Sequence, residues 1–133
     1  MNETLRNVRA LLRHRGVLVV VSDLRGTLDW DRSLALCAQQ HEVVVVEVRD
    51  PREEVLPNVG GVWLVDPETG SPTFVDTASP RLRQRFEGAA AEERSQVRHA
   101  VVRTGARHVV LSTEGDWLHP FADAISAGRR RPS

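Results

Sequence analysis

Three runs of apolar residues constrain the fold of this chain most strongly. They are "VLVVV" at residues 17–21, the valine-rich run at 43–48 and "HVVL" at 108–111. A parallel strand that is covered on both faces has such a continuous apolar run, whereas a half-exposed strand alternates apolar with polar residues. The runs predict parallel strands at 17–22, 43–48 and 108–112, with both faces of the sheet covered by helices.

The segments between these runs have helical spacing. Apolar residues recur every three or four positions over residues 5–12 and 30–41, Ser79-Pro80 is a typical helix start, and Gly105 is a typical helix stop. The long helix between them has its apolar residues at Leu82, Phe86, Ala89, Ala90, Val97 and Val101. A last helix, capped by Asp116, has Leu118, Phe121, Ala122 and Ile125 as its predicted buried face. Alternating strands and helices with short connections predict a parallel α/β sheet.

The stretch "GVWLVDPETGSPTFVDT" interrupts this alternation. Its two strand-like runs, 62–65 and 73–75, flank the turn-rich "DPETGSP", which predicts an inserted β-hairpin over 62–76. No repeat or linker-like segment divides the chain. We therefore expect one domain over residues 1–128 and a disordered tail over 129–133.

Composition excludes several functional classes. The formal net charge of zero gives no electrostatic reason to expect nucleic acid or an anionic membrane as partner. No apolar run approaches the roughly 20 residues of a membrane-spanning helix, and no signal peptide is recognisable, so a cytoplasmic protein is expected. The single cysteine, Cys37, lies among apolar residues and is expected to be a buried small hydrophobe.

Polar residues follow each predicted strand. They are Ser22 and Asp23, then Arg49 and Asp50, then Ser112, Thr113 and Glu114. In a parallel sheet the carboxyl ends of the strands share one edge, where ligands bind. The alternative is that these hydroxyls and carboxylates only cap helices and close turns.

The stretch "DLRGTL" at 23–28 comes within one residue of the phosphatase signature D-x-D-G-T-L. Arg25 occupies the position of the second aspartate, which serves as general acid and base in those enzymes. All 18 basic residues are arginine, so the lysine on which such phosphatases and receiver domains rely is missing. The histidines show no zinc-ligand spacing and no serine-nucleophile elbow is present. We therefore predict no catalytic residue and no enzymatic activity.

The order of segments resembles a known family. "VVVSDL", "HEVVVVEVRDPREEVLPNVGGVWLVDPETG", "FVDTASPRLRQRF" and "HVVLSTEGD" together resemble the domain-of-unknown-function 58 family, over nearly the whole chain. The resemblance implies a von Willebrand factor A-like, doubly wound α/β fold and an association with MoxR-type AAA+ ATPases. Here it implies a partial fold, the C-terminal half, with about three parallel strands, flanking helices and the inserted hairpin.

The same resemblance implies an incomplete metal site. Such domains hold Mg²⁺ with an Asp-x-Ser-x-Ser loop, a threonine and a later aspartate, and Asp23 matches only that aspartate. The nearest stretch to the main loop, "DRSLA" at 31–35, lacks its last serine and follows no strand. Asp23, with Ser22 beside it, is therefore expected to form a weak site at most. No cofactor is expected, with Mg²⁺ conceivable only if the missing N-terminal half is supplied.

The leading functional hypothesis is a non-enzymatic protein-interaction module, linked to a MoxR-type AAA+ ATPase. The alternatives are a metal-dependent hydrolase that uses Asp23 and neighbouring strand-end residues, and a truncated reading frame without independent function. The strand at 17–22 contains no proline or charge, the usual protection of a free sheet edge. Self-association of the isolated chain through this strand is therefore expected.

Overall fold

The computed structural model describes residues 1–128, so the predicted tail at 129–133 lies outside the described residues. Its elements are α1 (Asn2–Leu11), β1 (Val17–Ser22), α2 (Asp31–Gln40), β2 (Glu42–Arg49), η1 (Pro51–Glu53), β3 (Gly61–Val65), β4 (Pro72–Asp76), α3 (Pro80–Arg103), β5 (Arg107–Ser112) and α4 (Leu118–Gly128). Among these helices none is long and apolar enough to cross a membrane.

The contacts within the chain group into two compact units. One contains residues 1–50 together with those from 95 onward, and the other contains residues 51–94. The first unit holds the three-stranded sheet, and the second holds the hairpin and the first part of α3. The expectation of a single domain over 1–128 stays a prediction.

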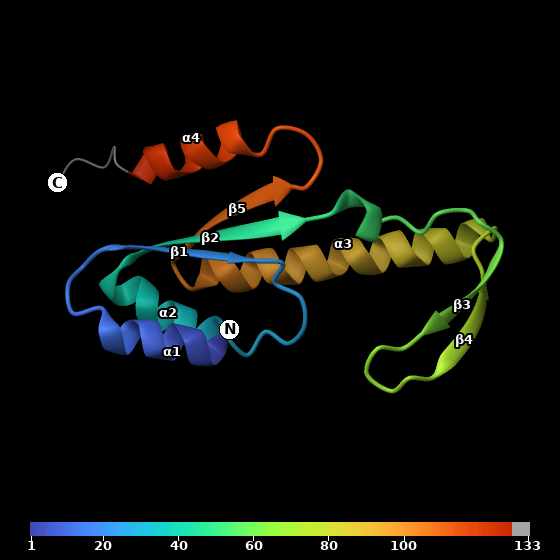
Figure 1. Ribbon diagram of the computed structural model, residues 1–133, viewed down its shortest axis with the longest axis horizontal. Coiled ribbons are helices and arrows are strands. Elements are labelled where there is room, and N and C mark those ends of the chain that lie inside the picture. Colours follow the sequence, from blue (N-terminus) through green and yellow to red (C-terminus); the bar gives the residue numbers. More distant parts are fainter. Residues whose placement is uncertain (129–133) are drawn as a thin grey trace. The chain divides into compact units, whose positions relative to one another are not determined.

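The sheet consists of three parallel strands in the order β1-β2-β5 (Figure 1). Val19 is paired with Val44, and Val46 with Val109, which fixes the register across the sheet. The three predicted strands are therefore confirmed, to within one residue at each end. Among the described residues, β1 has a neighbouring strand on one side only.

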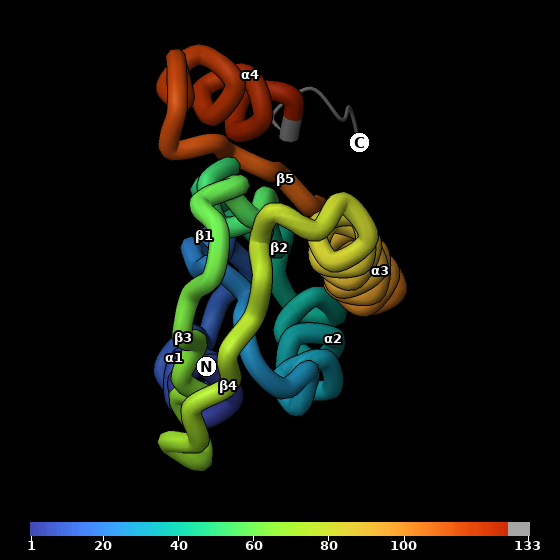
Figure 2. The backbone as a smooth tube through the Cα atoms, turned by 90° about the vertical axis from the view of Figure 1, so that its right-hand side faces the viewer, coloured from blue at the N-terminus to red at the C-terminus, as the bar shows by residue number. Residues whose placement is uncertain are grey.

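The main core lies between one face of the sheet and α1, α2 and the later part of α3. Leu34, Cys37, Val45 and Val101 are completely buried there, and Leu18 and Val20 of β1 pack against them. The tube in Figure 2 shows α2 and α3 on this side of the strands and α4 on the other.

The single cysteine lies inside this core. The Sγ atom of Cys37 is 3.8 Å from the carbonyl oxygen of Leu5. Burial raises the pKa of the Cys37 thiol, and the nearby charge of Arg9 opposes this shift without cancelling it. The prediction of a buried cysteine is confirmed.

The second face carries a smaller core beneath α4. Val44, Val46 and Leu111 are buried there, and Phe121 and Ile125 of α4 pack against them. The predicted cap of α4 is confirmed, because the backbone N–H of Leu118 donates to Asp116 Oδ1 over 3.0 Å. The predicted buried face is right only in part, since Leu118 and Ala122 are exposed.

The prediction that both faces of the sheet are covered is wrong at β1. Exposure alternates along this strand, and Val17, Val19 and Val21 are 62%, 40% and 63% exposed. These three side chains, here called the valine row, share a face with Val44 and Val46. The cause is that α4 packs on β5 and β2, so that no described helix covers β1 on that face.

The long helix α3 is buried only in its last third. Val97, Ala100 and Val101 pack in the main core, whereas Phe86 is 38% exposed and Ala89 is also exposed. The predicted apolar stripe over the whole helix is therefore wrong for its first half. Residues 80–94 belong to the unit that contains the hairpin and has no large core of its own.

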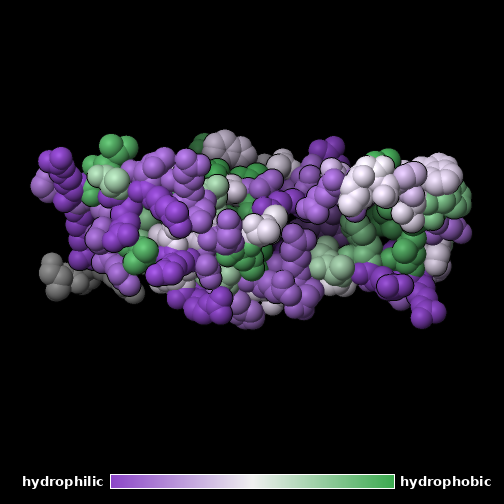
Figure 3. Space-filling model, turned by 90° about the horizontal axis from the view of Figure 1, so that it is seen from below, coloured by the Kyte–Doolittle hydropathy of each residue, from purple (hydrophilic) through white to green (hydrophobic). Residues whose placement is uncertain are grey.

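The hairpin is confirmed, with β3 and β4 antiparallel and Trp63 opposite Phe74. The two rings are 5.4 Å apart in an edge-to-face arrangement, and both are largely exposed. A Cβ at Gly61 would lie 2.4 Å from Cζ of Phe74, so a larger residue at this position would displace the exposed Phe74 ring. Figure 3 shows pale and green side chains gathered over this hairpin, where Leu64 and Val65 are also exposed.

Candidate functional site

The exit loop of β1 holds Ser22 and Asp23 in local hydrogen bonds. Ser22 Oγ accepts from the backbone N–H of Leu24 over 3.0 Å, and Asp23 Oδ1 accepts from that of Arg25 over 3.2 Å. Leu24 has a positive φ of 53°, which is uncommon for a residue with a side chain. Burial of that side chain in the main core holds this conformation. The loop thus directs Leu24 inward and leaves Asp23 exposed.

The oxygen atoms at this edge do not form a magnesium site on their own. Asp23 contributes one carboxylate, and Ser112 Oγ accepts from the backbone N–H of Glu114 over 3.1 Å. Within residues 1–128, no group of three or more His, Cys, Asp or Glu side chains is placed to hold a metal ion. Mg²⁺ keeps several of its waters when it binds a protein, but it still requires one or two carboxylates and further oxygen ligands. The donor set in the described chain does not fit Mg²⁺.

A charged cluster that the sequence did not reveal lies near the same edge, on the main-core face. Arg49 Nε and Nη2 donate to Glu47 Oε1 and Oε2 over 2.6 and 3.0 Å. His108 Nε2, from β5, lies 2.7 Å from Glu47 Oε2. The Glu47 and His108 side chains are 5% and 7% exposed.

The Glu47 carboxylate is ionised in this cluster. Burial by itself raises its pKa, but hydrogen bonds and charge from His108 and Arg49 together outweigh burial and hold the pKa below its ordinary value. A buried carboxylate with all its partners in place stabilises the geometry of the strands that carry those partners. Because Glu47 and His108 are buried, we interpret the cluster as structural, and Arg49 as its partly exposed end.

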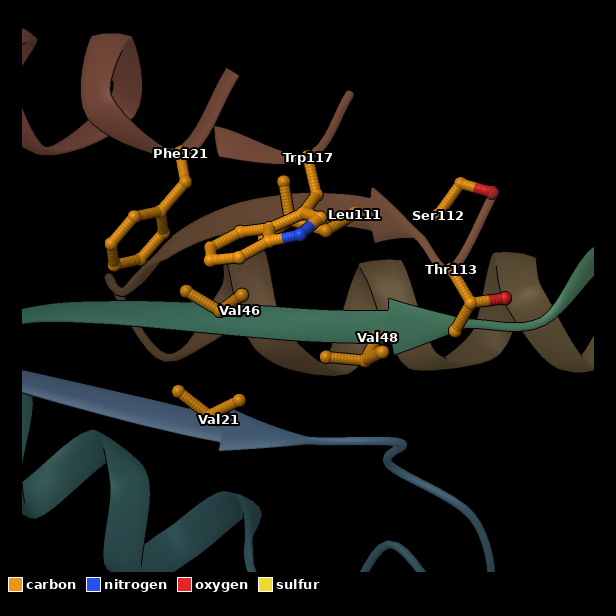
Figure 4. Close-up of a pocket in the computed structure, with 8 residues that line it drawn as sticks. All are labelled: Val21, Val46, Val48, Leu111, Ser112, Thr113, Trp117 and Phe121. Carbon is orange, nitrogen blue, oxygen red and sulfur yellow. The ribbon is translucent and has the colours of Figure 1, made fainter. Parts of the chain in front are cut away.

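An apolar hollow opens on the other face of the sheet, near the carboxyl ends of the strands. It encloses about 420 Å³, and it is lined by Val21, Val46, Val48, Leu111, Ser112, Thr113, Trp117 and Phe121. Figure 4 shows the Trp117 and Phe121 rings on one side, Val21 of β1 on the other, and the Ser112 and Thr113 hydroxyls toward the strand ends. The two rings are 6.5 Å apart, and Trp117 is 53% exposed. The hollow suits an apolar side chain rather than a polar substrate.

Sequence patterns gave no direct signal for this hollow or for the cluster. Trp117 lies in a turn-rich segment just before α4. Glu47 interrupts an apolar strand, and its hydrogen-bond partner His108 is 61 positions away in the sequence. The one available signal was a pair of charges, Glu47 and Arg49, two positions apart and thus on one face of the strand.

Comparisons with known proteins identify the family. The profile of the family described as "Protein of unknown function DUF58" matches residues 1–96. An uncharacterised protein of Mycobacterium avium, MAV169, is 39% identical over 118 residues, which cover 89% of this chain and 69% of that protein. Uncharacterised proteins of Mycobacterium bovis, Mb1516, and Mycobacterium tuberculosis, Rv1480, are equally similar, and this chain spans 37% of each. No solved structure matches. The chain belongs to the DUF58 family.

Proposed function

We propose that this chain is a non-enzymatic protein-interaction module that receives a β-strand from another polypeptide at the outer edge of β1. The proposal rests on the position, composition and exposure of β1. It is the edge strand of a parallel sheet, it contains only apolar residues up to Ser22, and every second side chain is exposed. Natural edge strands are normally protected by charges, proline, bulges or a covering segment.

An added strand supplies the hydrogen-bond partners that the outer edge of β1 lacks. The outward N–H and C=O groups of β1 have no strand partner in the described part of the chain. An incoming strand gains affinity from main-chain hydrogen bonds and specificity from alternate side chains. The valine row then contacts apolar groups of the same partner, which removes an exposed patch of the kind that marks protein-binding surfaces.

We also propose that this sheet is the C-terminal half of a von Willebrand factor A-like domain. Its support is membership of the DUF58 family, three parallel strands with helices on both sides, and Asp23 directly after β1. On this proposal the incoming strand occupies the place of a central strand of the complete sheet. The longer mycobacterial relatives have room for further elements, since this chain spans 37% of their length.

The family resemblance makes a MoxR-type AAA+ ATPase the first partner to test. Amide hydrogen exchange of the full chain is measured at a concentration at which light scattering reports a monomer. It is measured for the chain alone, with the purified ATPase, and with a peptide of residues 15–23 as a model strand. Binding at the edge slows exchange of those β1 amides that are not bonded to β2. A peptide N-methylated at alternate residues is the control, because it cannot complete the hydrogen-bond ladder. Unchanged exchange in β1 with both the ATPase and the peptide contradicts the proposal.

A further inference from the structure

A second cavity lies where the strands of the parallel sheet begin, at the end opposite to the arrowheads in Figure 1. It encloses about 480 Å³, and we call it the amino-edge cavity. Its polar lining comes from the starts of all three strands, and small apolar residues of α2 and α4 complete it. The residues that matter here are Arg15 before β1, His41 and Glu42 at the start of β2, Arg107 at the start of β5, Ala38 and Ala127.

Two buried side-chain nitrogens of these lining residues have no hydrogen-bond partner within residues 1–128. They are His41 Nε2 and Arg107 Nε. His41 is 5% exposed, and its other ring nitrogen, Nδ1, accepts from the backbone N–H of Gly16 over 3.3 Å. Because a neutral imidazole carries one proton, this bond assigns that proton to Nε2, and the Nε of an arginine always carries one. Both nitrogens are therefore donors without an acceptor, and burying such groups costs free energy.

The charges that line the cavity leave an excess of one positive charge. Arg107 Nη2 lies 3.4 Å from Glu42 Oε1, so these two residues form an ion pair. Arg15 lines the cavity and makes no ion pair within the described chain. Water satisfies the two unpaired donors without balancing this charge, whereas an anion that accepts two hydrogen bonds does both. The lining therefore favours an anion over water.

Other charges near this edge limit the anion to a single negative charge. The helices α2 and α3 end just before β2 and β5, and α4 ends beside Ala127. The C-terminus of a helix carries partial negative charge, so these three ends oppose a doubly charged phosphate more than a carboxylate. Arg13, His14 and Arg103 are close in sequence and exposed, but they do not line the cavity. The arginines at 129–131 lie outside the described residues.

We propose that the amino-edge cavity binds the carboxylate of a small organic acid with a short apolar chain. The carboxylate oxygens accept from His41 Nε2 and Arg107 Nε, a planar match that guanidinium groups make well. The charge of Arg15 balances the ligand, and the apolar chain contacts Ala38 and Ala127. Both donor nitrogens are shielded from solvent, so a lining side chain moves to admit the ligand, and the exposed Arg15 is best placed to do so. This site lies at the opposite end of the strands from Asp23 and does not depend on strand addition at β1.

The test is an NMR titration of the full chain with butyrate at pH 8. Sodium chloride keeps the ionic strength constant, so that a shift reports the ligand rather than screening. Butyrate is expected to shift the His41 ring signals and the Arg107 Nε–H signal in a saturable way. Butyramide, which has the same shape without the charge, is expected to leave them unchanged. Inorganic phosphate, doubly charged at this pH, is expected to bind more weakly than butyrate.

Variants separate a binding role from a structural one. In His41→Asn the amide oxygen takes the place of Nδ1 and keeps the bond to Gly16, but the Nε2 donor is lost. This variant is expected to weaken butyrate about fivefold. Arg15→Gln is expected to weaken it to a similar degree, whereas Arg13→Gln, in the same loop and equally exposed in class, is the matched control and should leave affinity unchanged. Circular dichroism checks that each variant is folded.

Several results would overturn the carboxylate site. The first is the absence of saturable shifts up to about 50 mM butyrate, and the second is an equal response to butyramide. Tighter binding of phosphate than of butyrate would assign the cavity to a different anion and contradict the proposal. Equal weakening by Arg15→Gln and Arg13→Gln would show only a general attraction to the basic loop. If His41→Asn does not fold, the comparison of these two exposed arginines decides the outcome by itself.

Discussion

The Nε2 atom of His108 and the Oε2 atom of Glu47 lie 2.7 Å apart and join β5 to β2 diagonally. In the register of the sheet, His108 is opposite Val45, and Glu47 is opposite Val110, so the pair spans two positions along the strands. A slip of one residue would turn one of the two side chains to the other face and leave a buried carboxylate without that partner. The pair therefore specifies the register between β2 and β5.

Glu47→Gln is expected to lower the free energy of unfolding at pH 7 by about 2 kcal/mol. The substitution keeps the shape but replaces charge-assisted hydrogen bonds from Arg49 and His108 with weaker ones. The folded-state pKa of Glu47 is lower than its ordinary value of 4.5. Its ionised form therefore stabilises the fold above about pH 4.5, and this contribution is lost as the pH falls through the folded-state pKa.

Urea unfolding at pH 7 and at pH 3.5 checks both the size and the sign of this effect. The difference between the native chain and Glu47→Gln is expected to be largest at pH 7 and to shrink at pH 3.5. Glu114→Gln, an exposed carboxylate in the loop after β5, is the control and should change stability by no more than about 0.5 kcal/mol. A difference that stays constant between the two pH values would contradict the assignment.

Thr77→Val is expected to destabilise the unit of residues 51–94 by about 1–2 kcal/mol. Thr77 is 1% exposed; its Oγ1 donates to the carbonyl of Gly60 over 2.6 Å and accepts from the N–H of Val59 over 3.0 Å. Valine keeps the shape but leaves both backbone groups without this partner. Faster amide exchange at Val59 and in β3–β4 is the measurement. Thr73→Val, on an exposed position of β4, should leave exchange unchanged.

The strands were predictable from sequence because an apolar run is a local property, and the hairpin because its turn residues are local as well. Exposure of the valine row was not predictable, since a run such as "VLVVV" does not report whether a neighbouring element covers it. The Glu47 cluster depends on His108, which is distant in sequence. The exposed first half of α3 shows the same limit, because helical spacing of apolar residues does not ensure that a core lies beneath them.

Magnesium is expected to bind the chain with a millimolar or weaker dissociation constant, which corresponds to about 4 kcal/mol. Asp23 provides a single carboxylate, and its Oδ1 already accepts a backbone hydrogen bond. Such a donor set does not offset the dehydration of the ion. Titration calorimetry of the native chain and Asp23→Ala is the measurement. Micromolar affinity that disappears in Asp23→Ala would mean that other residues complete a site.

The isolated chain is expected to self-associate through the outer edge of β1 when no partner strand is present. Each unpaired backbone group that loses water costs roughly 1–3 kcal/mol, so this edge must contact either water or another strand. Antiparallel pairing of two β1 strands is the simplest solution, because a two-fold interface closes on itself. Light scattering at tens of micromolar should then report dimers, and amides across 17–22 should exchange slowly. The model-strand peptide of residues 15–23 should compete for the same edge and shift the mixture toward monomer. A monomer with fast-exchanging β1 amides at that concentration would show that water alone satisfies the edge.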